Sequence, residues 1–72
     1  MPNVIVHYVN GSTDTIGKPS FVAALDFARH GISYSGGRVR RVELETEPGS
    51  LRAVWDATWT AESRQAGLWA PC

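Results

Sequence analysis

Residues 38–59 read RVRRVELETEPGSLRAVWDATW, two runs of alternating apolar and charged side chains on either side of an EPGS sequence at 47–50. An alternation with a period of two is the pattern of a half-buried strand. Pro-Gly between two such runs indicates a reversal of the chain. The stretch therefore predicts a β-hairpin, and the rest of the chain must supply the layer that covers it.

The side chains also predict the register of this hairpin. A loop of two or of four residues gives one and the same pairing, and one face then carries the apolar pairs Leu44 with Ala53 and Val42 with Trp55. The other face carries the charge pairs Glu45 with Arg52 and Arg41 with Asp56. Opposite charges across a strand pair contribute about 0.2–1 kcal/mol each. A loop of three or five residues loses both sets, so we expect the apolar face to join the core.

Val39 is out of phase with the apolar residues of its own run. Two explanations stay open. Either a β-bulge lies near Arg40, or Val39 lies on the solvent face.

The N-terminal run, residues 4–9 (VIVHYV), is β-branched and aromatic and apolar on both faces apart from His7. It predicts a central strand. Asn10-Gly11 is a strong hairpin signal, so residues 12–16 form either a short returning strand or a polar loop. The lack of apolar alternation before Ile16 favours the loop.

A helix is expected after the sequence GKPS at 17–20, with Pro19 in its first turn. The apolar residues at helical spacing are Phe21, Ala24, Leu25 and Ala28, widened by Val22 and Phe27. Arg29 and His30 suit the C-terminal end of the helix dipole, and Gly31 ends the element. So wide a stripe predicts a helix lying flat across a sheet, with Asp26 toward solvent.

These elements predict an α+β fold, a three- to four-stranded mainly antiparallel sheet with one α-helix packed on one face, in a single domain over residues 1–72. One helix covers one face only. We expect the opposite face to be left to solvent or to a partner, and it would carry Arg41, Glu43, Glu45, Arg52, Asp56 and Val54. Residues 60–67 form either a short helical turn or a loop into a last strand at 68–70.

Composition narrows the function classes. Seven basic residues balance seven acidic ones, so no overall charge attracts nucleic acid or an anionic membrane. Cys72 is the single cysteine, so no intrachain disulfide and no cysteine zinc site can form. No apolar run approaches the roughly 18 residues of a membrane span. We expect a cytoplasmic protein without metal or cofactor, and its small size leaves a homodimer open.

No set of residues indicates catalysis. His7 is in the predicted first strand and His30 at the helix end, and no Cys, Asp or Glu stands at ligand spacing from either. A sheet with one helix also offers little concave volume for a substrate. We therefore expect no enzymatic activity.

Two kinds of binding remain. A single-stranded nucleic-acid module would use Arg38, Arg40, Arg41 and Arg52 with stacking from Tyr34, Trp55 or Trp59. The alternating acidic residues oppose a phosphate backbone on that face. A protein partner fits better, since arginine and tryptophan are enriched at interface hot spots. The residues expected to bind it are Arg38, Arg40, Arg41, Glu43, Glu45, Arg52, Asp56 and Trp69, the last being either folded onto the core or part of an interface.

In layout the chain resembles the small inhibitors that bacteriophages encode against host defence, the anti-CRISPR proteins. The features that carry the resemblance are the small size, a lone strand followed by a helix at 21–28, the hairpin at 38–59 and the lack of a catalytic set. The resemblance implies a protein that binds a CRISPR effector complex in the host cytoplasm. It implies that binding blocks either target DNA binding or nuclease recruitment.

Overall fold

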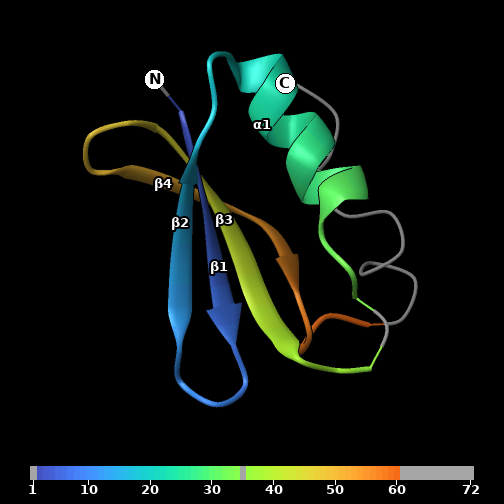
Figure 1. Cartoon of the computed structure of the whole chain (residues 1–72). Coiled ribbons are helices and arrows are strands. Elements are labelled where there is room, and N and C mark those ends of the chain that lie inside the picture. The colour runs from blue at the N-terminus through green and yellow to red at the C-terminus, as the bar shows by residue number, and fades with distance from the viewer. Residues whose placement is uncertain (1, 35, 61–72) are drawn as a thin grey trace.

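The computed structural model describes residues 2–34 and 36–60. They form a four-stranded antiparallel sheet in the order β2-β1-β3-β4, with one helix packed on it (Figure 1). The predicted α+β class is confirmed. The predictions for residues 61–70, including the place of Trp69, lie outside the described residues.

The first two strands, β1 (Asn3–Tyr8) and β2 (Thr13–Gly17), form a hairpin. The central position of β1 is confirmed. The polar loop expected at 12–16 is wrong, because these residues pair with β1 as a strand. As an edge strand β2 needs to bury little, and Ile16 is its one side chain that is not fully exposed. Threonine suits such a strand, which is why apolar alternation was a poor guide here.

The helix α1 (Phe21–Asp26) continues into a wider π-helical turn, η1 (Phe27–Gly31). Its N-terminus is capped by Ser20, whose Oγ accepts from the Ala23 backbone N–H at 3.1 Å, so the predicted place of Pro19 in the first turn is wrong. Gly31 ends the element as predicted.

The fully buried side chains of the helix are small. Ala24 and Ala28 are both 0% exposed, and the longer Phe21 and Leu25 pack against the same core while partly exposed. Phe27 is partly buried, as the wide stripe predicted. Val22 is 72% exposed, so the stripe does not extend to it.

The second hairpin joins β3 (Val39–Glu47) to β4 (Ser50–Asp56) through the two residues Pro48 and Gly49. At its open end the predicted pairs are confirmed: they are Val42 with Trp55 and Arg41 with Asp56. The pair beside the turn, Glu47 with Ser50, is also in the predicted register, but the three pairs in between are displaced by one residue. The observed partners there are Glu43 with Ala53, Leu44 with Arg52 and Glu45 with Leu51, so the predicted pairs Leu44–Ala53 and Glu45–Arg52 are wrong.

Two bulges cause this local displacement. One leaves Thr46 without a partner beside the turn, and the other inserts Val54 into β4 and restores the predicted register. Proline followed by Gly49, at φ 82°, is the pattern of a type II turn, whose twist does not match that of the strands. Bulges add local twist to a strand, so the two bulges adjust the twist of the strands to that of the turn. The second bulge also buries Val54 completely, although the opposite face was expected for it.

A third irregularity settles the position of Val39. Tyr8 pairs with Val39 and His7 with Arg41, so Arg40 is the extra residue of a bulge in β3. Val39 is 4% exposed. Of the two explanations left open, the bulge is correct.

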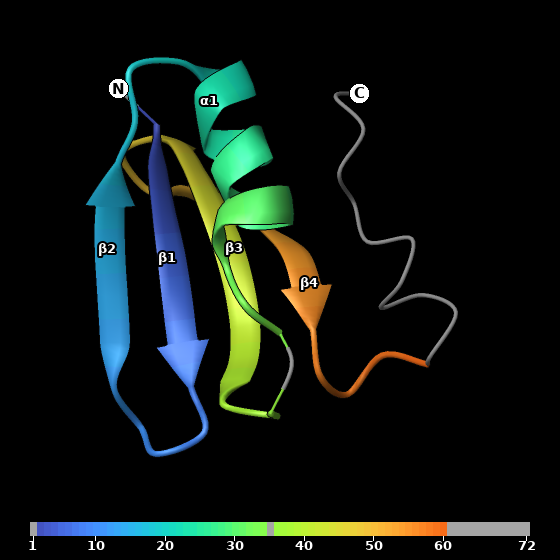
Figure 2. The ribbon, with the colours of Figure 1, turned by 45° about the vertical axis from the view of Figure 1, so that its right-hand side comes forward.

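The core lies between the helix and one face of the sheet (Figure 2). Its fully buried larger side chains come from three strands and are Val4, Val6, Val42, Leu44 and Val54. Residues paired across antiparallel strands share a face. The other face, here called the open face, therefore consists of Asn3, Ile5, His7, Thr13, Thr15, Gly17, Arg41, Glu43, Glu45, Leu51, Ala53 and Asp56.

Candidate protein-binding face

A continuous polar network crosses the open face from β2 to β4. His7 lies between Thr13, whose Oγ1 is 3.5 Å from Nδ1, and Glu43, whose Oε1 is 2.6 Å from Nε2. Arg41 continues the network, with Nε 3.5 Å from Glu43 Oε2 and Nη1 2.7 Å from Asp56 Oδ2. One side chain from each outer strand and three from the inner strands are thus held in a fixed order.

Asp56 anchors the network at β4. Its Oδ1 accepts from the Thr58 backbone N–H at 2.8 Å and from Thr58 Oγ1 at 2.7 Å, while Oδ2 accepts from Arg41. These bonds, the Thr58 backbone N–H first, hold the pKa of Asp56 below its ordinary value of 3.8. The hydrogen bond to Asp56 in turn raises the pKa of Arg41. Both groups are therefore charged at neutral pH and neutralise each other.

A second polar contact lies nearer the turn, where Asn3 Nδ2 donates to Glu45 Oε1 at 2.9 Å. Leu51 is paired with Glu45 and is 52% exposed. In the adjacent row of paired residues, Ile5 and Ala53 lie on either side of Glu43. The open face thus combines paired charges of both signs with apolar side chains.

The structure brings together part of the predicted binding set. Arg41, Glu43, Glu45 and Asp56 meet on the open face. Arg52 does not, because the register displacement pairs it with Leu44 of the core face. Arg38 and Arg40 are exposed at the start of β3, and Trp69 lies outside the described residues.

Among the open-face residues that sequence reasoning missed are His7, Asn3 and Leu51. Asn3 and His7 share a face because they are four residues apart on one strand, and this signal was present in the sequence. Their partners Glu45 and Glu43 depend on the register between β1 and β3, which no local pattern encodes. Leu51 reaches this face because it lies in the displaced register between the bulges at Thr46 and Val54.

Thr13, His7 and Glu43 stand in the order hydroxyl, imidazole, carboxylate, which is also the order of a nucleophilic relay. Three features oppose that function. The hydroxyl contact is at the 3.5 Å limit, Arg41 occupies the second oxygen of the carboxylate, and Thr13 is exposed on a sheet surface. The geometry fits a network that fixes side chains better than one that transfers protons.

Two of the three aromatic residues considered for base stacking, Tyr34 and Trp55, pack beside the helix and not on the open face. Trp55 is 8% exposed and its ring centroid is 4.6 Å from that of Tyr34. Tyr34 Oη donates to the Ala28 carbonyl in the last helical turns, and burial raises the pKa of this phenol. Both rings are used in packing beside the helix, and the burial of Trp55 confirms that it joins the core, as the hairpin register predicted.

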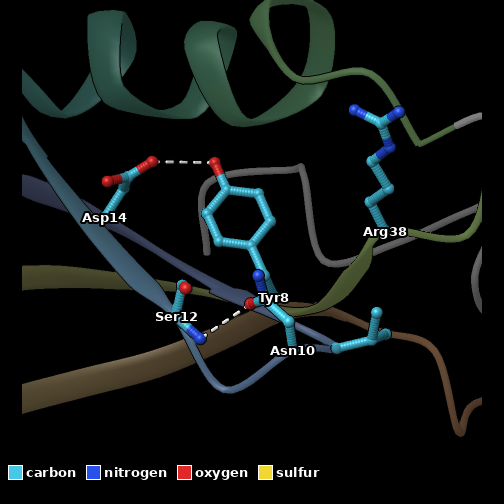
Figure 3. A pocket seen from close by; sticks show the side chains of 6 residues that line it. Tyr8, Asn10, Ser12, Asp14 and Arg38 are labelled. Atoms are coloured by element: carbon cyan, nitrogen blue, oxygen red, sulfur yellow. Dashed lines mark hydrogen bonds between the residues drawn. The ribbon is translucent and has the colours of Figure 1, made fainter.

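A hollow of about 630 Å³ lies at the tip of the first hairpin, lined by Tyr8, Val9, Asn10, Ser12, Asp14 and Arg38 (Figure 3). Tyr8 Oη donates to Asp14 Oδ2 at 2.9 Å, and this bond raises the pKa of Tyr8. The Ser12 backbone N–H donates to Asn10 Oδ1 at 2.9 Å. Most polar groups of the hollow thus bind one another, and its exposed lining gives a ligand little enclosure.

Among residues 2–34 and 36–60, no three His, Cys, Asp or Glu side chains are placed to hold a metal ion. No helix in the same part of the chain is long and apolar enough to cross a membrane. No known protein family, curated protein or solved structure matches the sequence or the fold.

Proposed function

We propose that the protein works by binding another protein through the open face, without chemistry of its own. The observation that supports this most is the paired network from His7 to Asp56 beside the exposed Leu51. Side chains already fixed by one another lose little conformational entropy when a partner docks. Apolar contact area with satisfied polar groups around it is also the make-up of protein interfaces.

The resemblance to anti-CRISPR proteins suggests which partner this is. We propose a CRISPR effector complex in the cytoplasm of the host cell. Binding would block target DNA binding or nuclease recruitment by occupying a protein surface. The mixed charges on the open face support a partner whose own surface carries both signs.

A mobility-shift assay tests this proposal directly. Guide-loaded effector complexes from the host are incubated with labelled target DNA, with and without the protein, and the fraction of bound DNA is measured.

A separate pull-down on the immobilised protein reports effector capture when nuclease recruitment is the blocked step. We expect one complex to be captured with the protein in stoichiometric excess.

Charge reversal locates the contact. Glu45→Lys changes the sign of a partly buried open-face residue, and we expect effector capture to weaken at least about tenfold, or about 1.4 kcal/mol. Asp26→Lys is the matched control, because Asp26 is exposed on the helix with 73% of its side chain accessible. Equal loss in both variants, or none in either, contradicts the open face as the contact.

The nucleic-acid alternative keeps one supporting observation. In the described residues the Arg38 and Arg40 side chains are exposed and make no hydrogen bond or ion pair. Two cations without stacking from Tyr34 or Trp55 give weak binding that falls steeply with salt. Binding of single-stranded nucleic acid is measured between about 50 and 200 mM salt. Tight binding that weakens over this range as several phosphate contacts require would favour the nucleic-acid module over the protein-binding function.

A further inference from the structure

Within residues 2–34 and 36–60, no strand pairs with the outer edge of β2. Hydrogen bonds to β1 mark both ends of the pairing: the Tyr8 N–H donates to the Ser12 carbonyl, and the Lys18 N–H to the Pro2 carbonyl, each at 2.9 Å. In an antiparallel ladder, alternate residues direct their backbone groups to one neighbour. The even-numbered residues of β2 therefore face β1.

It follows that Thr13, Thr15 and Gly17 direct their N–H and C=O groups away from the sheet. None of the three has a backbone partner on that side in the described part of the chain, and Figure 2 shows β2 as the outermost strand. Such a row of free groups is a template for another strand. Natural sheets block it with lysine, proline, bulges or charged side chains. The five residues of β2 contain no lysine, proline or bulge, and their one charge, Asp14, accepts a hydrogen bond from Tyr8 on the core side.

We infer that a second copy of the chain pairs with this edge, β2 against β2 and antiparallel, with Thr15 on the two-fold axis. In this register Thr15 faces its own counterpart, and Thr13 faces Gly17 of the second copy. All three outward residues then form hydrogen bonds. On the core side Asp14 faces Ile16 of the second copy.

The side chains of β2 select this register. A two-fold axis through Asp14 brings two carboxylates into direct opposition, with Cα atoms about 4.5 Å apart. A shift of the pairing by one residue would place the outward N–H and C=O groups of one copy opposite residues of the other copy whose groups point to β1. It would also put core-side residues of one copy beside open-face residues of the other. Pairing about Thr15 keeps Asp14 in its bond to Tyr8 and gives the second copy a neutral neighbour.

The axis of such a pair is perpendicular to the sheet, so both helices lie on one side and both open faces on the other. One eight-stranded surface results. Its central row runs from Ile5 through Thr15 to Thr15 and Ile5 of the second copy, because Ile5 pairs with Thr15 in each chain. The charged networks lie outside this row. If the proposed function holds, the second copy completes its docking surface, giving it an uncharged centre and a charged rim.

Sedimentation velocity of the full chain over a concentration series, without any partner, tests the pairing. The expected mass rises from one chain to two. Thr15→Pro should abolish the dimer, because it removes an outward N–H and blocks the approach of a strand, while the bonds to β1 do not use that N–H. Thr15→Val keeps the N–H and should retain the dimer. A wild-type mass of one chain throughout, or a dimer retained by a folded Thr15→Pro variant, overturns the inference.

Cross-linking provides a second readout that does not depend on the proline variant. In a Cys72→Ser background, Thr15→Cys should give a disulfide-linked dimer on mild oxidation, since hydrogen-bonded partners have Cα atoms about 5.5 Å apart. Thr13→Cys should not, because the two Thr13 positions lie about 14 Å apart in this register. Equal cross-linking at both positions contradicts the register. Neither experiment involves the effector complex, so dimer formation and effector binding succeed or fail separately.

Discussion

At the scale of single residues, Asp56 connects the fold to the open face. Its carboxylate is buried, accepts two hydrogen bonds from Thr58 and holds Arg41 against the sheet. Arg41 in turn contacts Glu43, which His7 contacts from the next strand. Removing the charge at Asp56 therefore affects both stability and the order of the network.

We predict that Asp56→Asn lowers the free energy of unfolding by about 2 kcal/mol at pH 7, because hydrogen bonds to a charged acceptor are replaced by weaker neutral ones. The pKa of Asp56 is lowered in the folded state, so its contribution is present above the unfolded value of about 3.9 and disappears as the pH falls through the folded value. The difference between variant and wild type should thus shrink below about pH 4. Urea unfolding from pH 7 to pH 2.5 measures it.

Asp26→Asn is the control for this series, because Asp26 is exposed and its contact with His30 Nε2 is long, at 4.0 Å. Its effect should stay within about 0.5 kcal/mol at every pH. If the difference in unfolding free energy between Asp56→Asn and wild type does not change with pH, the Asp56 carboxylate is not a cause of the loss of stability in acid.

At the scale of elements, the second hairpin shows what the sequence could and could not predict. Apolar and charged alternation identified both strands and the turn, and it gave the pairing of Val42 with Trp55 correctly. It missed the bulges at Thr46 and Val54, since a bulge preserves composition and changes only phase. Period-two reasoning fails locally wherever the backbone must adjust its twist to a turn.

The same limit applies to β2. Its residues carry no apolar alternation, because an edge strand with one inward apolar side chain, Ile16, needs none. The strong turn signal at Asn10-Gly11 was the better guide: Gly11 adopts φ 92° and its N–H donates to the Tyr8 carbonyl. Turn chemistry outweighed side-chain pattern at this position.

We predict that the turn of the second hairpin requires glycine. Gly49 has φ 82°, a conformation that costs an L-residue about 1–2 kcal/mol, so Gly49→Ala should lower the free energy of unfolding by that amount. Thermal unfolding followed by circular dichroism measures the loss.

Gly17→Ala is the matched control. Gly17 is not among the residues with positive φ, and an added Cβ meets only Asn3 Oδ1 at an ordinary 3.4 Å. This variant should be neutral, or more stable by up to about 1 kcal/mol through the unfolded chain. If both glycines tolerate alanine equally, the turn conformation assigned to Gly49 is incorrect.

At the scale of the whole molecule, one helix on a four-stranded sheet leaves the open face without a covering element among the described residues (Figures 1 and 2). The sequence predicted this layout, because one amphipathic helix has only one apolar stripe to bury. It predicted four of the residues that meet there, Arg41, Glu43, Glu45 and Asp56. It predicted the pairing of Arg41 with Asp56 correctly. It did not predict the partners of Glu43 and Glu45, because His7 and Asn3 lie on a strand more than thirty residues away.

That pairing changes how the face is expected to recognise a partner. Charges held by one another attract a distant partner only weakly, so apolar contact at Leu51 and shape should contribute more than steering. The exposed leucine is therefore a sharper probe of docking than any of the arginines. Substituting Arg41 would also disturb the buried Asp56.

The most direct test compares two exposed apolar residues on opposite sides of the molecule. Leu51 is 52% exposed on the open face, and Val22 is 72% exposed on the helix. Each is changed to arginine, folding is verified by circular dichroism, and effector capture is measured by pull-down. The account predicts that Leu51→Arg abolishes capture while Val22→Arg binds like wild type. Capture retained by Leu51→Arg and lost in Val22→Arg would place the contact on the helix side and contradict the account.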